Sequence, residues 1–461
     1  MPRLLLVTYH FPPAGGAGTL RALRFARYLR GFGWETEVVC ADPLPAVTRD
    51  PSLQRAVPPD VPVHFVRSFE PGRFSDSWEQ PLQKIVRNLF RTFDFMLVPD
   101  EHVGWVRPAL SLCSHLRSRT GGFDAVLTTG PPFSTHLIGL GLRERFGLPW
   151  VADFRDDWTG FNDAFRGGAM RRRPSYERRL EADVLRQASV VLTVNESLQA
   201  AIRARREGVE VEVIPNGFDP ADFETTSPQR RPAGPFVIRH LGSLYEQRSP
   251  AVFLEGLRRL GGSERLRGRL EARFLGRVVG PVPDLLAAPD LGDVVCYDGI
   301  QPHAESIRAM CESDALLLII DQVQQAEQIW TGKVFEYLGA RRPILGLMPP
   351  EGQLARLLRE SSDQHRIVPT GDAGAVAAAL ESMLDASFHA SLPESSVLAQ
   401  FRADALTQQL ARLLERCVES DGALRRQGHP RLAAKGREQQ PARVGVARAL
   451  DEPLHRAPHQ T

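Results

Sequence analysis

TGKVFEYLGARRPIL, residues 331–345, follows the apolar run ALLLII at 315–320 and leads into a second apolar run, PILGL at 343–347. Short apolar runs bounded by turn residues are typical of buried strands. The stretch therefore predicts a strand, a loop, a helix that begins near Lys333, and a second strand. Strand–helix alternation of this kind is the unit from which α/β folds with parallel sheets are built.

The start of the predicted helix carries groups that suit a nucleotide diphosphate. Thr331 and Gly332 form the join between loop and helix, where free N–H groups and the helix dipole attract phosphate. Lys333 adds a full positive charge there. Glu336 follows on the same helix face and can accept two hydroxyls, as from a ribose. A surface Lys–Glu pair is the alternative interpretation of this spacing.

Lysine is rare in this chain, which makes its presence in the loop informative. The only lysines among the 57 basic residues are Lys84, Lys333 and Lys435. Arginine has a planar, forked head group, whereas lysine carries a compact ammonium. A lysine at position 333 of so arginine-rich a chain indicates a site shaped for the smaller cation.

Composition limits the classes of protein to which this chain can belong. Its 461 residues are too many for one ordinary core and predict two or three domains. The formal net charge is only +2, which argues against nucleic-acid binding. Five scattered cysteines form neither a zinc pattern nor a disulfide framework. With no signal peptide or spanning segment evident, we expect a cytoplasmic protein, at most peripheral at the inner face of a membrane.

The alternation of strand and helix runs through both halves of the chain and predicts two parallel-sheet domains. The predicted strands are Leu4–Thr8, Glu35–Cys40, Ala125–Thr129, Trp150–Phe154, Val190–Val194 and Glu210–Ile214, then Val237–Leu241, Leu270–Leu275, Val294–Tyr297, Ala315–Ile320, Ile344–Leu347 and His365–Val368. We predict an N-terminal domain over residues 1–220, a linker over 221–235, a C-terminal domain over 236–394, a helix over 395–420 and a disordered tail over 421–461.

Residues 67–108, between the second and third predicted strands, are rich in aromatic and basic side chains. Such an amphipathic stretch suits a membrane surface or a lipid-bearing substrate. A pair of helices packed on the N-terminal domain is the alternative, and we prefer it.

The first loop and helix carry a second motif. Tyr9-His-Phe-Pro-Pro-Ala-Gly-Gly-Ala-Gly18 follows the first predicted strand, and LRGFGWETEVV at 29–39 leads into the next. With the Lys333 helix, these segments resemble the GT-B-fold retaining glycosyltransferases, specifically glycosyltransferase family 4. The resemblance spans about residues 3–418.

This resemblance implies two Rossmann-like domains that face a central cleft. The N-terminal domain would lie on the acceptor side, and the C-terminal domain would bind the nucleotide sugar. The backbone N–H groups of the loop at Gly15 and Gly16 would lie near the donor diphosphate.

Residues Asp153-Phe-Arg-Asp-Asp-Trp158 directly follow a predicted strand, where many family members carry a catalytic His or Asp. The resemblance implies that Asp156 acts at the sugar or the acceptor and that Arg155 orients it. An ion-pair cluster that braces the loop is the alternative. His136, on the first turns of a predicted helix, is a further candidate for contact with sugar or acceptor, against the alternative of a buried structural histidine.

The sequence Leu241-Gly-Ser-Leu-Tyr-Glu-Gln-Arg248 is similar to the family's diphosphate clamp. Gly242 and Ser243 stand at its start, and Arg248 supplies one of the family's two cations. Glu336 corresponds to the second of the family's paired glutamates, whereas the first position is Gln328.

Together these matches imply a hexosyltransferase-like enzyme of polysaccharide or glycolipid assembly. It would move a sugar from a nucleotide diphosphate to a hydroxyl of a saccharide or lipid-linked acceptor, without a metal or other cofactor. A nucleotide-sugar epimerase and a non-catalytic nucleotide-sugar-binding protein of the same fold are the alternatives. A Rossmann dehydrogenase is not supported, because no Gly-x-Gly-x-x-Gly follows the first strand.

Overall fold

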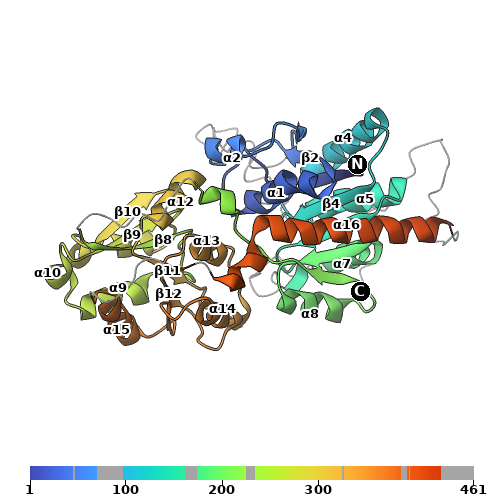
Figure 1. Cartoon of the computed structure of the whole chain (residues 1–461). Helices are drawn as coiled ribbons and strands as arrows, with labels where there is room; N and C mark the ends of the chain where they lie inside the picture. Colours follow the sequence, from blue (N-terminus) through green and yellow to red (C-terminus); the bar gives the residue numbers. More distant parts are fainter. Residues whose placement is uncertain are drawn as a thin grey trace, which may run out of the picture.

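The computed structural model describes residues 1–44, 47–69, 97–160, 174–224, 234–323, 326–385, 392–393 and 395–426. The chain forms two α/β domains that lie side by side (Figure 1). Each domain is built on a parallel sheet, which confirms the predicted fold class.

The N-terminal sheet has seven strands in the order β3-β2-β1-β4-β5-β6-β7. They are β1 (Arg3–Thr8), β2 (Glu35–Ala41), β3 (Val63–Val66), β4 (Ala125–Gly130), β5 (Trp150–Phe154), β6 (Val190–Thr193) and β7 (Val211–Val213). Along β1, Leu5 and Val7 belong to one core cluster, and Leu4 and Leu6 belong to another. Because helices cover both faces of this sheet, apolar residues point to both faces of β1.

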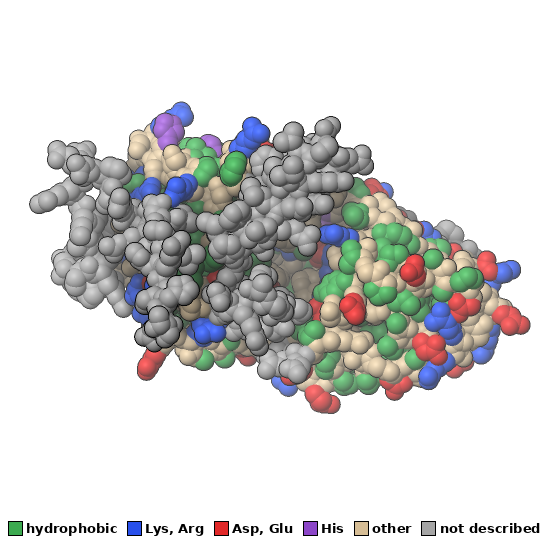
Figure 2. Space-filling model, turned by 180° about the vertical axis from the view of Figure 1, so that it is seen from behind, with side chains coloured by type: hydrophobic (Ala, Val, Ile, Leu, Met, Phe, Trp, Pro, Cys, Tyr) green, Lys and Arg blue, Asp and Glu red, His purple; other side chains and the backbone are tan. Residues whose placement is uncertain are grey.

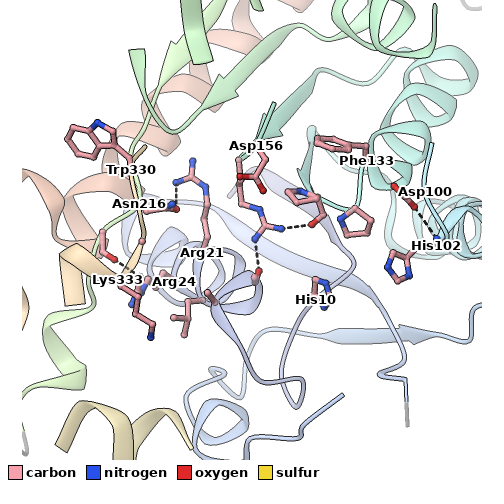
Figure 3. Close-up of a pocket in the computed structure, with 18 of the residues that line it drawn as sticks. His10, Arg21, Arg24, Asp100, His102, Phe133, Asp156, Asn216, Trp330 and Lys333 are labelled. Carbon is pink, nitrogen blue, oxygen red and sulfur yellow. Dashed lines mark hydrogen bonds between the residues drawn. The ribbon is translucent and has the colours of Figure 1, made fainter. Parts of the chain in front are cut away.

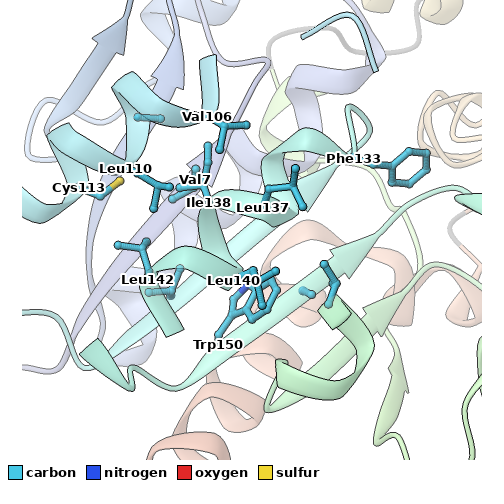
Figure 4. Close-up of a cluster of buried hydrophobic side chains, with 14 of the residues drawn as sticks. Val7, Val106, Leu110, Cys113, Phe133, Leu137, Ile138, Leu140, Leu142 and Trp150 are labelled. Carbon is cyan, nitrogen blue, oxygen red and sulfur yellow. The ribbon is translucent and has the colours of Figure 1, made fainter. Parts of the chain in front are cut away.

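Four helices pack on the face that carries Leu5 and Val7: α4 (Val106–Thr120), α5 (Ser134–Phe146), α7 (Pro174–Gln187) and α8 (Glu196–Arg205). Figure 4 shows this core, in which Trp150 of β5 lies beside α5. A Cβ at Gly139 of α5 would come within 2.3 Å of the Trp150 ring. Glycine at this position therefore allows α5 to approach the sheet closely.

The C-terminal sheet has six strands in the order β10-β9-β8-β11-β12-β13. They are β8 (Phe236–Leu241), β9 (Leu270–Leu275), β10 (Val295–Gly299), β11 (Ala315–Ile319), β12 (Ile344–Leu347) and β13 (Arg366–Val368). One face packs on α9 (Ala251–Arg259), α10 (Gly262–Leu266), α11 (Val282–Leu286) and α15 (Ala373–Met383). The other packs on α12 (His303–Cys311), α13 (Lys333–Gly339) and α14 (Gln353–Ser361).

The chain returns to the N-terminal domain at its end. After a 3-10 turn at Ser396–Phe401, the long helix α16 (Ala403–Arg426) packs beside α1 (Ala17–Tyr28) on the second face of the N-terminal sheet (Figure 1). Leu406, Leu410 and Leu414 lie in that core. The helix continues to Arg426, so the tail predicted to be disordered from 421 begins as helix; residues 427–461 lie outside the described part.

The extra helical turns have a local cause. Asp421 forms a buried ion pair with Arg143 of α5, and Arg143 also donates to the carbonyls of Gly147 and Leu148. This contact anchors the last turns of α16 to the domain.

The sequence prediction missed β3, a four-residue strand, and the short helix α2 (Pro51–Arg55) that precedes it. Residues 70–96, which make up most of the predicted aromatic and basic segment, lie outside the described residues. Whether residues 67–108 contact a membrane therefore stays a prediction, as does a cytoplasmic location.

The face of the C-terminal domain seen in Figure 2 shows no strong bias of charge. Figure 2 shows acidic and basic side chains interspersed over the C-terminal domain, in keeping with the net charge of +2. Within the described residues, no helix combines the length and apolar character needed to cross a membrane.

Candidate functional site

A cavity of about 580 Å³ lies between the two domains (Figure 3). On the N-terminal side it faces the carboxyl ends of β1 and β4, whose following helices α1 and α5 cover opposite faces of the sheet. This reversal leaves a crevice, where α/β proteins commonly bind ligands. The cavity is lined by His10, Ala17, Gly18, Leu20, Arg21, Arg24, Pro99, Asp100, Glu101, His102, Pro131, Pro132, Phe133, Arg155, Asp156, Asn216, Gly217, Trp330, Gly332, Lys333 and Glu336.

Lys333 and Glu336 stand together in the C-terminal wall. The Lys333 Nζ donates to Glu336 Oε2 at 3.0 Å, as the spacing predicted. The Lys333 side chain is 29% exposed, whereas that of Glu336 is 3% exposed. The ammonium thus lines the cavity; among the described residues only Glu336 accepts one of its three N–H groups, which leaves the other two for a ligand.

Glu336 is held in its charged form by cations from both domains. Burial alone would raise the pKa of this carboxyl, but the charges of Lys333, His303 and Arg24 outweigh burial and lower the pKa to about 2. Arg24 comes from α1 and donates to Glu336 Oε1 at 3.4 Å across the cleft. The sequence prediction did not identify Arg24, which lies 312 residues from Glu336.

Arg21, one turn before Arg24, is bound within the N-terminal side of the site. Its Nε and Nη2 donate to the two oxygens of Asp153 at 2.9 and 3.0 Å. It also donates to the carbonyls of Ile214 and Pro215, in the segment that leaves the N-terminal sheet. Arg21 therefore joins α1, β5 and this segment at the cavity wall.

Arg155 lines the cavity and is bound by the backbone of two loops. Its three guanidinium nitrogens donate to the carbonyls of Gly130, Gly18 and Pro131. In the described part of the chain Arg155 donates no hydrogen bond to Asp156. Arg155 consequently braces the loops after β1 and β4, because every nitrogen of its head group is used by the backbone.

Asp156 follows Arg155 in the chain, and its side chain is open to the cavity (Figure 3). Desolvation by the surrounding protein raises the pKa of its carboxyl, and the charge of Arg155 partly offsets this. Within the described residues, no hydrogen bond or ion pair engages this carboxylate. The Asp156 carboxylate can thus accept a hydrogen bond from a ligand hydroxyl; that it acts at the sugar or the acceptor stays a prediction.

His136 does not line the cavity, so the structure favours the structural interpretation of this histidine over the catalytic one. It is fully buried; its Nδ1 lies 2.9 Å from Thr128 Oγ1, and its ring stacks on Phe154 with centroids 4.4 Å apart. The helix start was predicted correctly, but His136 lies on the face of α5 that packs against the sheet.

We expect acid to destabilise the protein in part through His136. Burial lowers the pKa of its imidazole from 6.5 to about 3. Between these values the unfolded chain binds a proton that the folded chain does not. The free energy of unfolding should therefore fall as the pH drops from 6.5 towards 3, by up to about 1.4 kcal/mol per pH unit.

Urea unfolding of the wild type and of His136→Asn between pH 7 and pH 5 measures this effect. The variant should lose less stability per pH unit, although it is less stable overall. His240 and His365, whose pKa values burial lowers to about 4, should leave some pH dependence in the variant. Equal slopes for the two proteins would contradict the assignment.

The predicted clamp around Arg248 does not reach the cavity wall. Arg248 instead donates to Asp321 through Nε at 2.6 Å and Nη2 at 3.2 Å. Ser243 is exposed, and Gly242 lies nearer to the site. A Cβ at Gly242 would be 4.0 Å from Lys333 Cε.

Within the glycine loop, Gly15 and Gly16 lie outside the lining of the cavity. The Gly15 N–H donates to the carbonyl of Thr48 at 2.8 Å, and Gly16 has φ of +98°, which disfavours other residues. The next residues, Ala17 and Gly18, begin α1 and do face the cavity. At the start of α13, Thr331 accepts a hydrogen bond from the Lys333 N–H, and Gly332 lines the cavity.

Several other lining residues were not predicted. Asp100 accepts from the backbone N–H groups of Ser134 and His102 and so caps the start of α5. On the opposite wall, Trp330 stacks on Phe335 and donates to Gln353. Neither has a recognisable motif around it, and only the fold brings them to one cavity.

Comparison with known proteins agrees with this architecture. Residues 15–217 match the family model described as a glycosyl transferase 4-like domain. No curated protein matches the chain. The family match includes the glycine loop and both Arg155 and Asp156.

Solved structures of similar fold extend the likeness over the whole chain. Sucrose-phosphate synthase from Thermosynechococcus elongatus is 15% identical, with 93% of this chain and 99% of that chain covered and a TM-score of 0.58. An α,α-trehalose-phosphate synthase (UDP-forming) from Burkholderia xenovorans, in complex with glucose-6-phosphate, is 13% identical, with coverage of 90% and 100% and a TM-score of 0.53. WaaG, a glycosyltransferase involved in lipopolysaccharide biosynthesis, is 16% identical, with coverage of 91% and 99% and a TM-score of 0.52.

The chain therefore has the GT-B fold, two Rossmann-like domains with a cavity between them. Its N-terminal domain is similar to the domain that the glycosyl transferase 4-like model describes.

Proposed function

We propose that this protein is a retaining glycosyltransferase of the family 4 type, which moves a hexose from a nucleotide diphosphate to a hydroxyl acceptor. The observation that carries the proposal is the inter-domain cavity with Lys333 and Glu336 in one wall and Asp156 in the other. The domain match and the GT-B fold support it. Among the similar structures are a UDP-forming synthase and a glycosyltransferase of lipopolysaccharide biosynthesis, which favours a role in polysaccharide or glycolipid assembly.

The donor would bind with its diphosphate at Lys333. This ammonium faces the cavity and has unused donors, whereas Arg21 and Arg155 are bound by protein acceptors. Glu336 lies next to it and would accept ribose hydroxyls. The charge that develops on the leaving diphosphate is then stabilised by a cation already in place.

The acceptor would enter beside Asp156, on the N-terminal side of the cavity. In a retaining reaction of this kind, the acceptor oxygen forms its bond to the anomeric carbon on the face from which the diphosphate leaves. The bond from that carbon to the diphosphate oxygen breaks, and the leaving phosphate takes the proton of the acceptor hydroxyl. No strong base of the protein is required, and Asp156 would position the hydroxyl. That the reaction needs no metal or other cofactor is part of the proposal.

A panel of UDP- and GDP-sugars, with UDP and GDP, tests the proposal by thermal unfolding. A ligand that binds only the folded state at 100 times its dissociation constant stabilises that state by about 2.7 kcal/mol. We expect one nucleotide class to raise the melting temperature. Proton NMR of the product formed with saccharide acceptors should then show the anomeric configuration of the donor.

Each other outcome selects an alternative. Interconversion of the donor sugar without an acceptor would indicate an epimerase. Stabilisation by a nucleotide sugar without turnover would indicate a non-catalytic binding protein. If no nucleotide sugar stabilised the protein, the proposal would be wrong.

A further inference from the structure

The side chain of Arg24 joins the two domains by a hydrogen bond to Glu336. What we infer from this contact rests on the proposed function. It belongs to α1 of the N-terminal domain and lines the cavity. Its Nη2 lies 3.4 Å from Glu336 Oε1 in the C-terminal domain and 3.9 Å from Asp222 Oδ2. Its Nη1 donates to the carbonyl of Gly217, in the segment that joins the domains.

The carboxylate of Glu336 is thus shared by two cations from two domains. Arg24 contacts Oε1, and Lys333, from the same helix as Glu336, contacts Oε2. Burial leaves the Glu336 side chain 3% exposed. A buried carboxylate needs a counter-charge, because removal of its partner leaves an uncompensated charge in the interior.

This requirement creates a conflict when a diphosphate binds. Lys333 has N–H donors left for the phosphates, but its single positive charge would have to compensate both the diphosphate and Glu336, to which it donates at 3.0 Å. Arg24 removes the conflict because it keeps Glu336 compensated while Lys333 turns to the ligand. His303 of the C-terminal domain also lowers the pKa of Glu336 through its charge, but among the described residues it makes no hydrogen bond to this carboxylate. The hydrogen bond that can replace the one from Lys333 comes from Arg24 of the N-terminal domain, so it is available only when the two domains are together.

We propose that Arg24 is a positioning residue that couples approach of the two domains to the release of Lys333 for the donor diphosphate. Arg24 acts through Glu336 and does not itself contact the phosphates. Arg21, on the same helix, cannot take this role, because its guanidinium is bound to Asp153 and to two carbonyls.

Binding of UDP and GDP to variants of the full chain, measured by calorimetry, tests the proposal. For the nucleotide that the wild type binds, Arg24→Ala should weaken affinity at least tenfold. Binding of the matching nucleoside, which has no phosphate, should change little. Arg24→Lys, which keeps the charge but not the fork, should recover part of the loss.

The decisive variant is the double mutant Arg24→Ala/Glu336→Gln. With no charge at position 336, the charge of Lys333 is no longer needed to compensate Glu336. The double mutant should therefore bind the nucleoside diphosphate more tightly than Arg24→Ala alone. Arg27→Ala is the matched control; Arg27 lies on the same helix, pairs with Asp219 at 3.1 Å, and should leave binding unchanged. Thermal unfolding of each variant checks that it is folded.

Three results would overturn the inference. Unchanged diphosphate affinity in Arg24→Ala shows that Arg24 has no part in binding. Equal losses for nucleotide and nucleoside show a general structural role. Failure of Glu336→Gln to rescue shows that Arg24 acts on the phosphates directly. A wild-type protein that binds no nucleoside diphosphate overturns the proposed function itself, and this inference with it.

Discussion

Lys333→Ala should lower the rate of sugar transfer about 100- to 1,000-fold, the cost of removing one preorganised charge from a developing anion. In the described part of the cavity wall, Lys333 keeps donors free, whereas Arg21, Arg24 and Arg155 are each bound to protein oxygens. The rate with saturating donor and the affinity for the nucleoside diphosphate should both fall. Steady-state kinetics together with calorimetry measure the two effects.

Two controls make this result specific. Lys333→Arg keeps the charge but has a bulkier head group, and Gly242 lies close to the lysine side chain, so we expect only partial activity. Arg341→Ala, just beyond the same helix, should be as active as the wild type. Turnover of Lys333→Ala within a few-fold of the wild type would refute the assignment of the donor site.

Strands were the part of the fold that the sequence predicted best. Those buried on both faces, such as β5 and β12, are mostly apolar runs, and their predicted bounds match the structure. The missed strand β3 lies at the sheet edge and has only one buried residue, Val66, so it lacks such a run. Phe65 is 46% exposed there.

The site was predictable only where its residues are close in the sequence. Lys333 and Glu336 stand three residues apart, and their contact follows from helix geometry. Arg24 reaches Glu336 across 312 residues, and no local pattern reports such a contact. Arg155 and Asp156 are adjacent, yet the Arg155 side chain is bound to backbone carbonyls whereas that of Asp156 is open to the cavity, because side-chain direction depends on the loops that surround them.

The largest effect on stability should follow from Asp153→Asn. Asp153 is fully buried at the end of β5 and accepts from Arg21 through both oxygens and from Thr129 Oγ1 at 2.7 Å. Asparagine has nearly the same shape but no charge, so the buried guanidinium of Arg21 would lose its counter-ion. Breaking a buried pair in this way costs about 3–5 kcal/mol.

Urea unfolding followed by tryptophan fluorescence would measure this loss, with Asp60→Asn as the control. Asp60 pairs with Arg30 at the surface, where an ion pair is screened by water, so its loss should change stability little. The double variant Arg21→Met/Asp153→Leu should be more stable than Asp153→Asn, because it removes both charges. It should not recover fully, since the carbonyls of Ile214 and Pro215 would lose the donors that Arg21 supplies. A loss for Asp153→Asn no larger than for Asp60→Asn would show that this pair does not hold α1 against the sheet.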